Sequence, residues 1–172
     1  LGLNQEATVR IFLDIYGEDF PYAAYKQEMR ELFFGPYYEQ SLTVKKGGRE
    51  LLAALKNAHI PVALATSTAQ ASVLKELKDA GIRDYFDQVI CGDMVSHSKP
   101  HPEIFLTACA ALGAKPEKTI VIEDSYNGIR AAYAGGMMPV MVPDMLQPTA
   151  EIEKMTIAVC ESLLDVKEKI GL

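Results

Sequence analysis

Two adjacent carboxylates end an apolar run in the second half of this 172-residue chain. Glu123 and Asp124 follow the run 119–122, and Ser125 and Asn127 come directly after them. Neighbouring carboxylates repel each other unless a positive charge lies between them. A hard cation such as Mg²⁺ binds carboxylate oxygens and water, so these residues can form a metal site. The alternative is a strand, a polar turn and a helix that Asp124 or Ser125 caps.

Three consecutive hydroxyl side chains follow another apolar run, residues 61–65. They are Thr66, Ser67 and Thr68, and a helical pattern begins at residue 69. Hydroxyls and free backbone N–H groups at the start of a helix form a ready site for an anion such as phosphate. The alternative is that one of these hydroxyls only caps the helix.

A lysine in a proline-rich loop is the third candidate for chemistry. Pro100 and Pro102 prevent regular structure around Lys99, and Pro102 suits the first turn of a following helix. A lysine on a stiff backbone can meet a phosphate as a point charge. The alternative is a solvated surface lysine. His97 and His101 flank Lys99 and are interpreted as surface loop histidines rather than substrate contacts.

In this order, the three segments resemble the haloacid dehalogenase-like phosphohydrolases. The similarity is greatest to their branch of small sugar-phosphate and nucleoside-phosphate phosphatases, which also contains β-phosphoglucomutase. It extends from about residue 44 to the C-terminus and includes Gly47 and the segments 134–137 and 140–144. The motifs therefore identify a family as well as a set of candidate residues.

The resemblance implies a definite reaction. An aspartate attacks phosphorus and forms an aspartyl-phosphate, a second aspartate two residues later acts as acid and base, and Mg²⁺ bridges nucleophile and phosphate. Thr66, with Ser67, would bind the phosphoryl oxygens, and Lys99 would neutralise charge. Asp124 would hold Mg²⁺, with Glu123 beside it as ligand or support. Phosphoryl transfer depends mainly on such positioning and charge neutralisation. Thr68, Ser125 and Asn127 are second-rank candidates.

The nucleophile motif of that family, Asp-x-Asp at the end of the first strand, does not precede these segments. The stretch 11–17 imitates it, but Tyr16 stands where the second acid should be. Apolar residues from Val9 to Tyr16 recur at helical spacing, so Asp14 is predicted to lie on a helix surface. The sequence therefore offers no convincing nucleophile.

A missing first strand would also affect the fold. In the family this strand lies in the middle of a parallel sheet, and unpaired buried backbone groups are costly. We therefore expect this chain to be part of a longer protein whose preceding segment supplies the strand and the nucleophile. The alternative is a catalytically inactive member that binds phosphate or Mg²⁺ or serves as an interaction module.

Substrate choice in this family depends mainly on the cap. Members like β-phosphoglucomutase carry an arginine early in the cap that binds a second phosphate, and Gln5 occupies the best-matching position here. This favours a phosphatase for a hexose phosphate or nucleoside monophosphate, similar to pseudouridine-5′-phosphatases. A phosphosugar mutase is the alternative.

Composition indicates a soluble globular protein. Hydrophobic residues make up 49% of the chain, which is ample for a core, and the apolar runs are too short to span a bilayer. The net charge of −6 argues against nucleic-acid binding. The three cysteines, Cys91, Cys109 and Cys160, suit buried free thiols in a reducing cytoplasm. We expect a small phosphorylated metabolite as partner, neither nucleic acid nor membrane, and leave the oligomeric state open.

The first 43 residues are predicted to form a partial, all-helical cap. Helical periodicity indicates helices over 4–16, 22–34 and 37–42. Four aromatic residues gather at the end of the second helix, and we expect them to pack within the cap rather than to line a site: Phe33, Phe34, Tyr37 and Tyr38.

Residues 44–172 are predicted to form an α/β core. Helices are expected over 49–58, 69–80, 102–112, 126–135 and 163–170, and strands over 61–66, 88–91, 119–122 and 138–142. This alternation predicts a Rossmann-like parallel sheet with helices on both faces, lacking its first, central strand. The candidate residues then fall at the carboxyl ends of strands, where open α/β sheets bind ligands.

Overall fold

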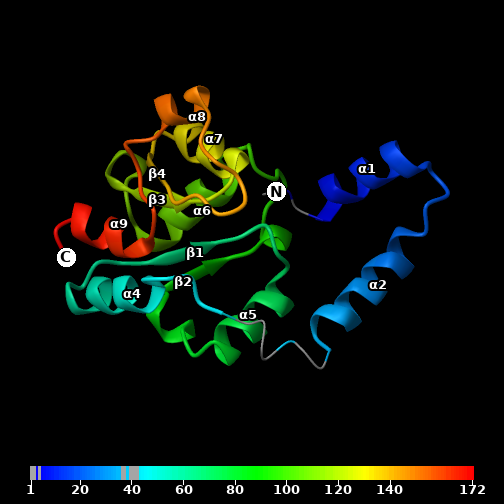
Figure 1. Cartoon of the computed structure of the whole chain (residues 1–172), viewed down its shortest axis with the longest axis horizontal. Coiled ribbons are helices and arrows are strands. Elements are labelled where there is room, and N and C mark those ends of the chain that lie inside the picture. Colours follow the sequence, from blue (N-terminus) through cyan, green and yellow to red (C-terminus); the bar gives the residue numbers. More distant parts are fainter. Residues whose placement is uncertain (1–2, 4, 36–37, 39–42) are drawn as a thin grey trace.

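The chain folds into an α/β core from which a helical hairpin projects (Figure 1). The computed structural model describes residues 3, 5–35, 38 and 43–172. The hairpin consists of α1 (Gln5–Tyr16) and α2 (Tyr22–Phe33). The helix predicted over 37–42 lies outside the described residues, apart from Tyr38.

The hairpin is held together by aromatic side chains. The ring centroid of Phe12 lies 5.1–5.7 Å from those of four other rings, and these belong to Tyr16, Phe20, Tyr22 and Tyr25. Neither helix contains a buried residue. Asp14 lies on the exposed surface of α1, as the periodicity predicted. Its carboxylate pairs with Arg10 at 3.0 Å. The hairpin is therefore a thin element without a core of its own.

The core contains two groups of parallel strands. In one, β1 (Ala63–Ala65) pairs with β2 (Gln88–Ile90), with Ala63 opposite Gln88. In the other, β3 (Ile120–Glu123) pairs with β4 (Met138–Met141), which pairs with the two-residue β5 (Ala158–Val159). The predicted parallel α/β architecture is confirmed, and β5 is an addition to it.

Helices precede the first strand of the core, separate successive strands and follow the last one. They are α4 (Gly48–Asn57), α5 (Gln70–Asp79), α6 (Glu103–Leu112), α7 (Tyr126–Ala134), α8 (Ala150–Met155) and α9 (Leu163–Lys169). Short 3₁₀ turns cover Arg83–Tyr85, Gly92–Met94 and Pro116–Lys118. The sequence predicted the longer helices within a few residues, but not α8, which has only six residues.

Helices cover both faces of the strands. On β4, Val140 packs in a buried cluster with residues of α4 and α9, whereas the next residue, Met141, packs with α7 and α8. Because successive side chains of a strand point to opposite faces, these helix pairs lie on opposite sides of the sheet. A third cluster joins the two groups of strands through α6, because it contains Ile90 of β2, Phe105 of α6 and Val121 of β3.

No backbone pairing joins β1 to β3 within the described part of the chain. The two strands nevertheless face a common cavity, which Leu64 and Ala65 line from β1 and Ile122 lines from β3. Ile120 and Ile122 are 38% and 36% exposed, which is unusual for isoleucines of a parallel strand. The core is therefore open between β1 and β3.

The aromatic residues at the end of α2 pack against one another. Phe33, Phe34 and Tyr38 have ring centroids 4.9–5.7 Å apart, and the ammonium of Lys75 lies 4.4 Å from the Tyr38 ring. These three residues therefore pack together, as expected, but their cluster also contacts α5 of the core. Tyr37 lies outside the described residues.

All three cysteines are free and buried, as predicted. Burial raises the pKa of the thiols of Cys91 and Cys160, which keeps them protonated. None of the helices in the described ranges has the length and apolar character needed to cross a lipid bilayer.

Candidate active site

A cavity of about 590 Å³ opens at the carboxyl ends of β1 and β3. Seven of the eight residues proposed from the sequence line it, namely Thr66, Ser67, Thr68, Lys99, Glu123, Asp124 and Ser125. The eighth, Asn127, lies in the first turn of α7 and does not contribute to the lining. The parallel strands thus bring together side chains from three distant segments.

Lys99 is buried at the junction of the two groups of strands. It is 4% exposed, which rules out the solvated surface lysine considered from the sequence. Its ammonium forms an ion pair with Glu123 at the end of β3 and lies 3.4 Å from the carbonyl oxygen of Ala65 in β1. The ring centroid of Phe105 lies 4.6 Å from the same nitrogen. Lys99 therefore spans the opening between β1 and β3, and the Lys99–Pro100 peptide bond beside it is cis.

Glu123 is held between Lys99 and the start of α7. Its Oε1 pairs with Lys99, and its Oε2 accepts hydrogen bonds from the backbone N–H groups of Asp124 and Ser125, both at 3.1 Å. The hydroxyl of Ser125 also donates to Oε2, at 2.9 Å. These contacts engage both carboxylate oxygens, so the geometry favours the supporting role for Glu123. Its role as a metal ligand stays a prediction.

The start of α7 is shaped to receive that carboxylate. Ser125 is the N-cap, because its hydroxyl accepts from the backbone N–H of Gly128 at 3.0 Å; Asp124 is therefore not the cap. A Cβ atom on Gly128 would lie 2.0–2.3 Å from the carboxyl atoms of Glu123. Glycine is thus required here because the helix and the Glu123 carboxylate approach each other so closely.

The hydroxyl loop is positioned by backbone contacts with the end of β2. The N–H of Thr66 donates to the carbonyl of Ile90 at 3.0 Å, and the N–H of Gly92 donates to the carbonyl of Thr68 at 3.0 Å. A Cβ on Gly92 would lie 2.2 Å from the carbonyl oxygen of Ser67, so a larger residue would displace the loop. The backbone therefore fixes how Thr66 and Ser67 face the cavity.

These hydroxyls do not cap α5, which was the alternative from the sequence. The N-cap of α5 is Ala69, and its side chain makes no capping bond. Instead, both carboxylate oxygens of Asp93 accept from the N–H of Gln70, at 3.1 and 3.2 Å. The hydroxyl oxygen of Thr66 accepts from the N–H of Thr68 at 3.2 Å, which tightens the loop.

Asp124 takes part in a cluster that the sequence did not reveal. The ammonium of Lys45 lies 3.0 Å from Oδ2 of Asp124 and 3.0 Å from Oδ2 of Asp144. Burial lowers the pKa of Lys45, but its hydrogen bonds to Asp144 and Asp124 outweigh this, so the net pKa is raised. One signal could have indicated Asp144, since it follows β4 at the edge where Glu123 and Asp124 follow β3.

The cluster fits a hard cation. Two carboxylate oxygens already converge on one positively charged atom, and all three side chains are about half exposed, so water can complete a coordination shell. Oxygen ligands with access to water are what Mg²⁺ prefers. Asp124 and Asp144 are therefore the residues that could hold this ion.

Comparisons with known proteins identify the family of the chain. The profile of the family described as haloacid dehalogenase-like hydrolase matches residues 1–142, so the chain belongs to that family. A phosphorylated carbohydrates phosphatase of Thermotoga maritima is 40% identical over 100 residues, which cover 58% of this chain and 46% of that protein. A Drosophila melanogaster protein named "Probable pseudouridine-5′-phosphatase" is 34% identical over the whole chain and 76% of its own length.

Solved structures give the same result. CbbY of Rhodobacter sphaeroides in complex with phosphate is 32% identical, with a TM-score of 0.63 over 71% of this chain and 55% of that one. The β-phosphoglucomutase of Clostridium difficile has a TM-score of 0.75 over 98% of this chain and 75% of that one, but at 24% identity it shows the fold alone. The chain spans about half the length of the first curated relatives it matches, between 42% and 55%.

Proposed function

We propose that this protein is a Mg²⁺-dependent phosphomonoester hydrolase. The observation that carries the proposal is the convergence of three kinds of group on one cavity. These are the hydroxyl loop with Thr66 and Ser67, the buried ammonium of Lys99, and the carboxylates of Asp124 and Asp144. Such a set can bind an anion on one side and a hard cation on the other.

Each group has a role that its position supports. Thr66 and Ser67 would donate hydrogen bonds to phosphoryl oxygens, and Lys99 would neutralise charge on the phosphate and the attacking group. Asp124 and Asp144 would hold Mg²⁺, which supplies positive charge to the phosphoryl group when bound. Lys45 would leave the two carboxylates when the ion binds, since its exposed side chain is free to turn into solvent.

We also propose that the nucleophile comes from a strand between β1 and β3. The carboxylates that line the cavity in the described residues are Glu123, Asp124 and Asp144, and a lysine engages each of them. Asp14 is paired with Arg10 on the hairpin and does not line this cavity. The open edges of β1 and β3 support a further strand whose last residues would enter the site beside Lys99.

The proposed substrate is a small sugar phosphate or a nucleoside monophosphate. Relatives named as phosphatases of phosphorylated carbohydrates, of pseudouridine 5′-phosphate and of hexitol compounds support this class. A mutase must hold two phosphates, and the neutral Gln5 of α1 does not supply a cation for the second one. Three free buried cysteines are consistent with a reducing cytoplasm as the location.

The test is release of inorganic phosphate from p-nitrophenyl phosphate by the natural full-length protein, with and without Mg²⁺. We expect Mg²⁺-dependent release that Asp124→Asn abolishes. The matched control is Asp14→Asn, which alters an exposed, paired aspartate outside the cavity and should leave release unchanged. Release that needs no Mg²⁺, release that survives in Asp124→Asn, or loss of release in Asp14→Asn would each overturn the proposal.

A second assay separates the phosphatase from the mutase. The full-length protein is incubated with a hexose phosphate, and both free phosphate and isomeric sugar phosphate are measured. Steady accumulation of free phosphate supports the hydrolase. Isomerisation without net phosphate release would favour the mutase, and neither product from well-folded protein would favour the inactive binding module.

A further inference from the structure

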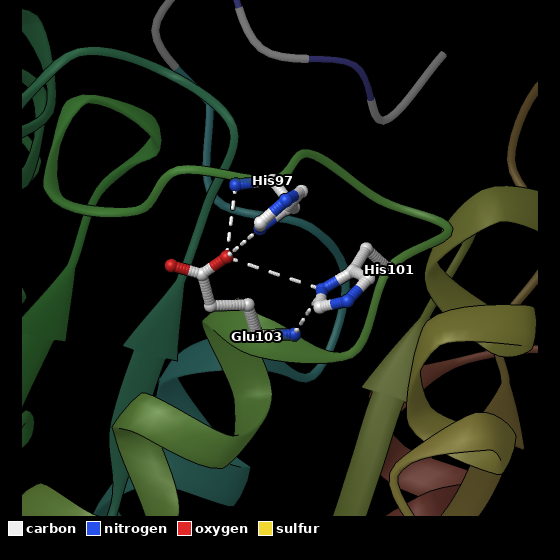
Figure 2. A group of neighbouring side chains, drawn as sticks. All are labelled: His97, His101 and Glu103. Atoms are coloured by element: carbon white, nitrogen blue, oxygen red, sulfur yellow. Dashed lines mark hydrogen bonds and ion pairs between the residues drawn. The ribbon is translucent and has the colours of Figure 1, made fainter.

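A second group of ligating side chains lies on the loop that carries Lys99, outside the proposed phosphatase cavity. It consists of His97, His101 and Glu103, which point toward one another in Figure 2. One possible ligand atom from each residue lies within 4.8 Å of the others. Nδ1 of His97 is 2.7 Å from Oε2 of Glu103, and Nδ1 of His101 is 3.9 Å from the same oxygen.

The backbone brings these three residues together without help from a distant segment. Glu103 is the first residue of α6, and its carboxylate accepts from the N–H groups of Ser96 at 2.8 Å and His97 at 2.9 Å. The N–H of Glu103 donates to Nδ1 of His101 at 3.3 Å, and the two imidazole rings have centroids 4.5 Å apart. The hydrogen bond from Ser96, followed by that from His97, lowers the pKa of Glu103, so its carboxylate is ionised at neutral pH.

A structural role explains only part of this arrangement. The two backbone N–H groups account for Glu103, because they fasten the loop to the start of α6. They do not require imidazole rings at positions 97 and 101. The side chains of His97 and His101 are 65% and 51% exposed, and exposed pairs of this kind add little stability.

Two imidazoles and one carboxylate are the ligands of a borderline divalent metal ion such as Zn²⁺. Mg²⁺ prefers oxygen ligands, so the donor set differs in kind from that of Asp124 and Asp144. Metal–ligand distances of about 2.0–2.2 Å require the side chains to rotate around an ion, and Oε2 of Glu103 already lies 2.7 Å and 3.9 Å from Nδ1 of the two rings. The ion would take the place of the hydrogen bond between Nδ1 of His97 and Oε2 of Glu103.

The surroundings leave room for further ligands. His97 and His101 line a second, open pocket of about 1200 Å³, and residues of α1 line it as well. Glu6 of α1 lines the same pocket. Water in this open pocket can therefore complete the coordination of an ion held on the loop.

We propose that His97, His101 and Glu103 form a binding site for a divalent transition-metal ion of the Zn²⁺ type, separate from the proposed Mg²⁺ site. Because two ligands flank Lys99 in sequence, a bound ion would fasten the loop on both sides of this lysine. The proposal does not depend on the phosphatase function, since it rests on the three side chains alone.

The test is calorimetric titration of ZnCl₂ into the full-length protein with saturating Mg²⁺, which would occupy the proposed site at Asp124 and Asp144. We expect about one equivalent of Zn²⁺ to bind. Loss of a ligand in His97→Asn or His101→Asn should weaken binding at least about tenfold, since even outer partners of metal ligands contribute that much. The matched control is His59→Asn, because His59 is exposed, lies outside the cluster, and has φ of +54°, which asparagine tolerates.

Further outcomes decide the same question. Asp124→Asn should leave Zn²⁺ binding unchanged, and Zn²⁺ should slow amide hydrogen exchange across residues 96–103 in the wild-type protein. Because both loop histidines are exposed, the variants should keep the wild-type melting temperature in EDTA. Absence of binding to the wild type, equal loss in His59→Asn, or loss in Asp124→Asn would overturn the proposal.

Discussion

Lys99 and Lys45 both pair with carboxylates that follow β3, but in opposite surroundings. The side chains of Lys99 and Glu123 are 5% and 10% exposed. Those of Lys45, Asp124 and Asp144 are 49%, 43% and 54% exposed. A buried charge cannot leave its partner without a large desolvation penalty, whereas an exposed one can exchange its partner for water. We infer that Lys99–Glu123 is a fixed framework, and that Lys45 can give way to another cation.

We expect the largest difference in the free energy of unfolding between variants that lack Lys99 and variants that lack Lys45. Lys99→Met should lower the free energy of unfolding by about 3–5 kcal/mol, because it leaves the Glu123 carboxylate buried without its cation. Lys45→Met should change it by less than about 1 kcal/mol, because its partners remain hydrated. Urea denaturation of both variants measures the two values.

A double-mutant cycle sharpens this comparison. Adding Glu123→Gln to Lys99→Met should recover part of the lost stability, since the uncompensated charge is then gone. Equal destabilisation by the two single lysine variants would show that burial does not distinguish the pairs.

A substitution at Gly128 tests how closely α7 packs against the Glu123 carboxylate. Gly128→Ala places a methyl group within 2.3 Å of the Glu123 carboxyl atoms, so the carboxylate must move away from α7. We expect a loss of about 1–3 kcal/mol, as for other overpacked sites. Helix propensity alone predicts that stability would instead increase, by up to about 1 kcal/mol. The sign of the measured change therefore shows whether the close approach to Glu123 outweighs helix propensity.

The exposed cluster should respond to metal rather than to unfolding. Lys45→Met removes the ammonium that competes for Asp124 and Asp144, a Coulomb effect of about 1 kcal/mol in water. Mg²⁺ should therefore bind about fivefold tighter, as measured by calorimetry. Lys46→Met is the matched control, because Lys46 is exposed next to Lys45 and does not line the cavity. An unchanged Mg²⁺ affinity in Lys45→Met would place the ion elsewhere.

The order of helices and strands could be predicted because its signals are local. Apolar runs before Thr66 and Glu123, and Pro102 at the start of α6, lie within a few residues of the structure they determine. The same signals predicted that the candidate site residues lie close together, because the carboxyl ends of parallel strands lie at the same edge of a sheet.

The Lys45 cluster could not be predicted because its members are distant in sequence. Lys45 lies 79 residues before Asp124, and nothing in the residues next to it indicates a carboxylate partner. Likewise, β5 has only two residues and α8 only six, too few to show periodicity. The buried ion pair between Lys99 and Glu123 could not be predicted either, because the spacing of residues in the sequence does not show which side chains are buried. The boundary of a cap at residue 43 stays a prediction.

The smallest expected effect concerns the loop that presents Lys99. Hydrogen bonds from Ser96 and then His97 lower the pKa of Glu103, so its carboxylate stabilises the fold at pH values above its unfolded pKa. This contribution is lost as the pH falls through the lowered native pKa, because the unfolded state then binds more protons. With EDTA present, Glu103→Gln should therefore lower the melting temperature slightly at neutral pH and make it less dependent on pH below about 5. Glu161→Gln, at an exposed glutamate, should follow the wild-type curve. If Glu103→Gln also follows the wild-type curve, the Glu103 carboxylate does not hold the loop. The fixed framework would then consist of the Lys99–Glu123 pair without the loop contacts of Glu103.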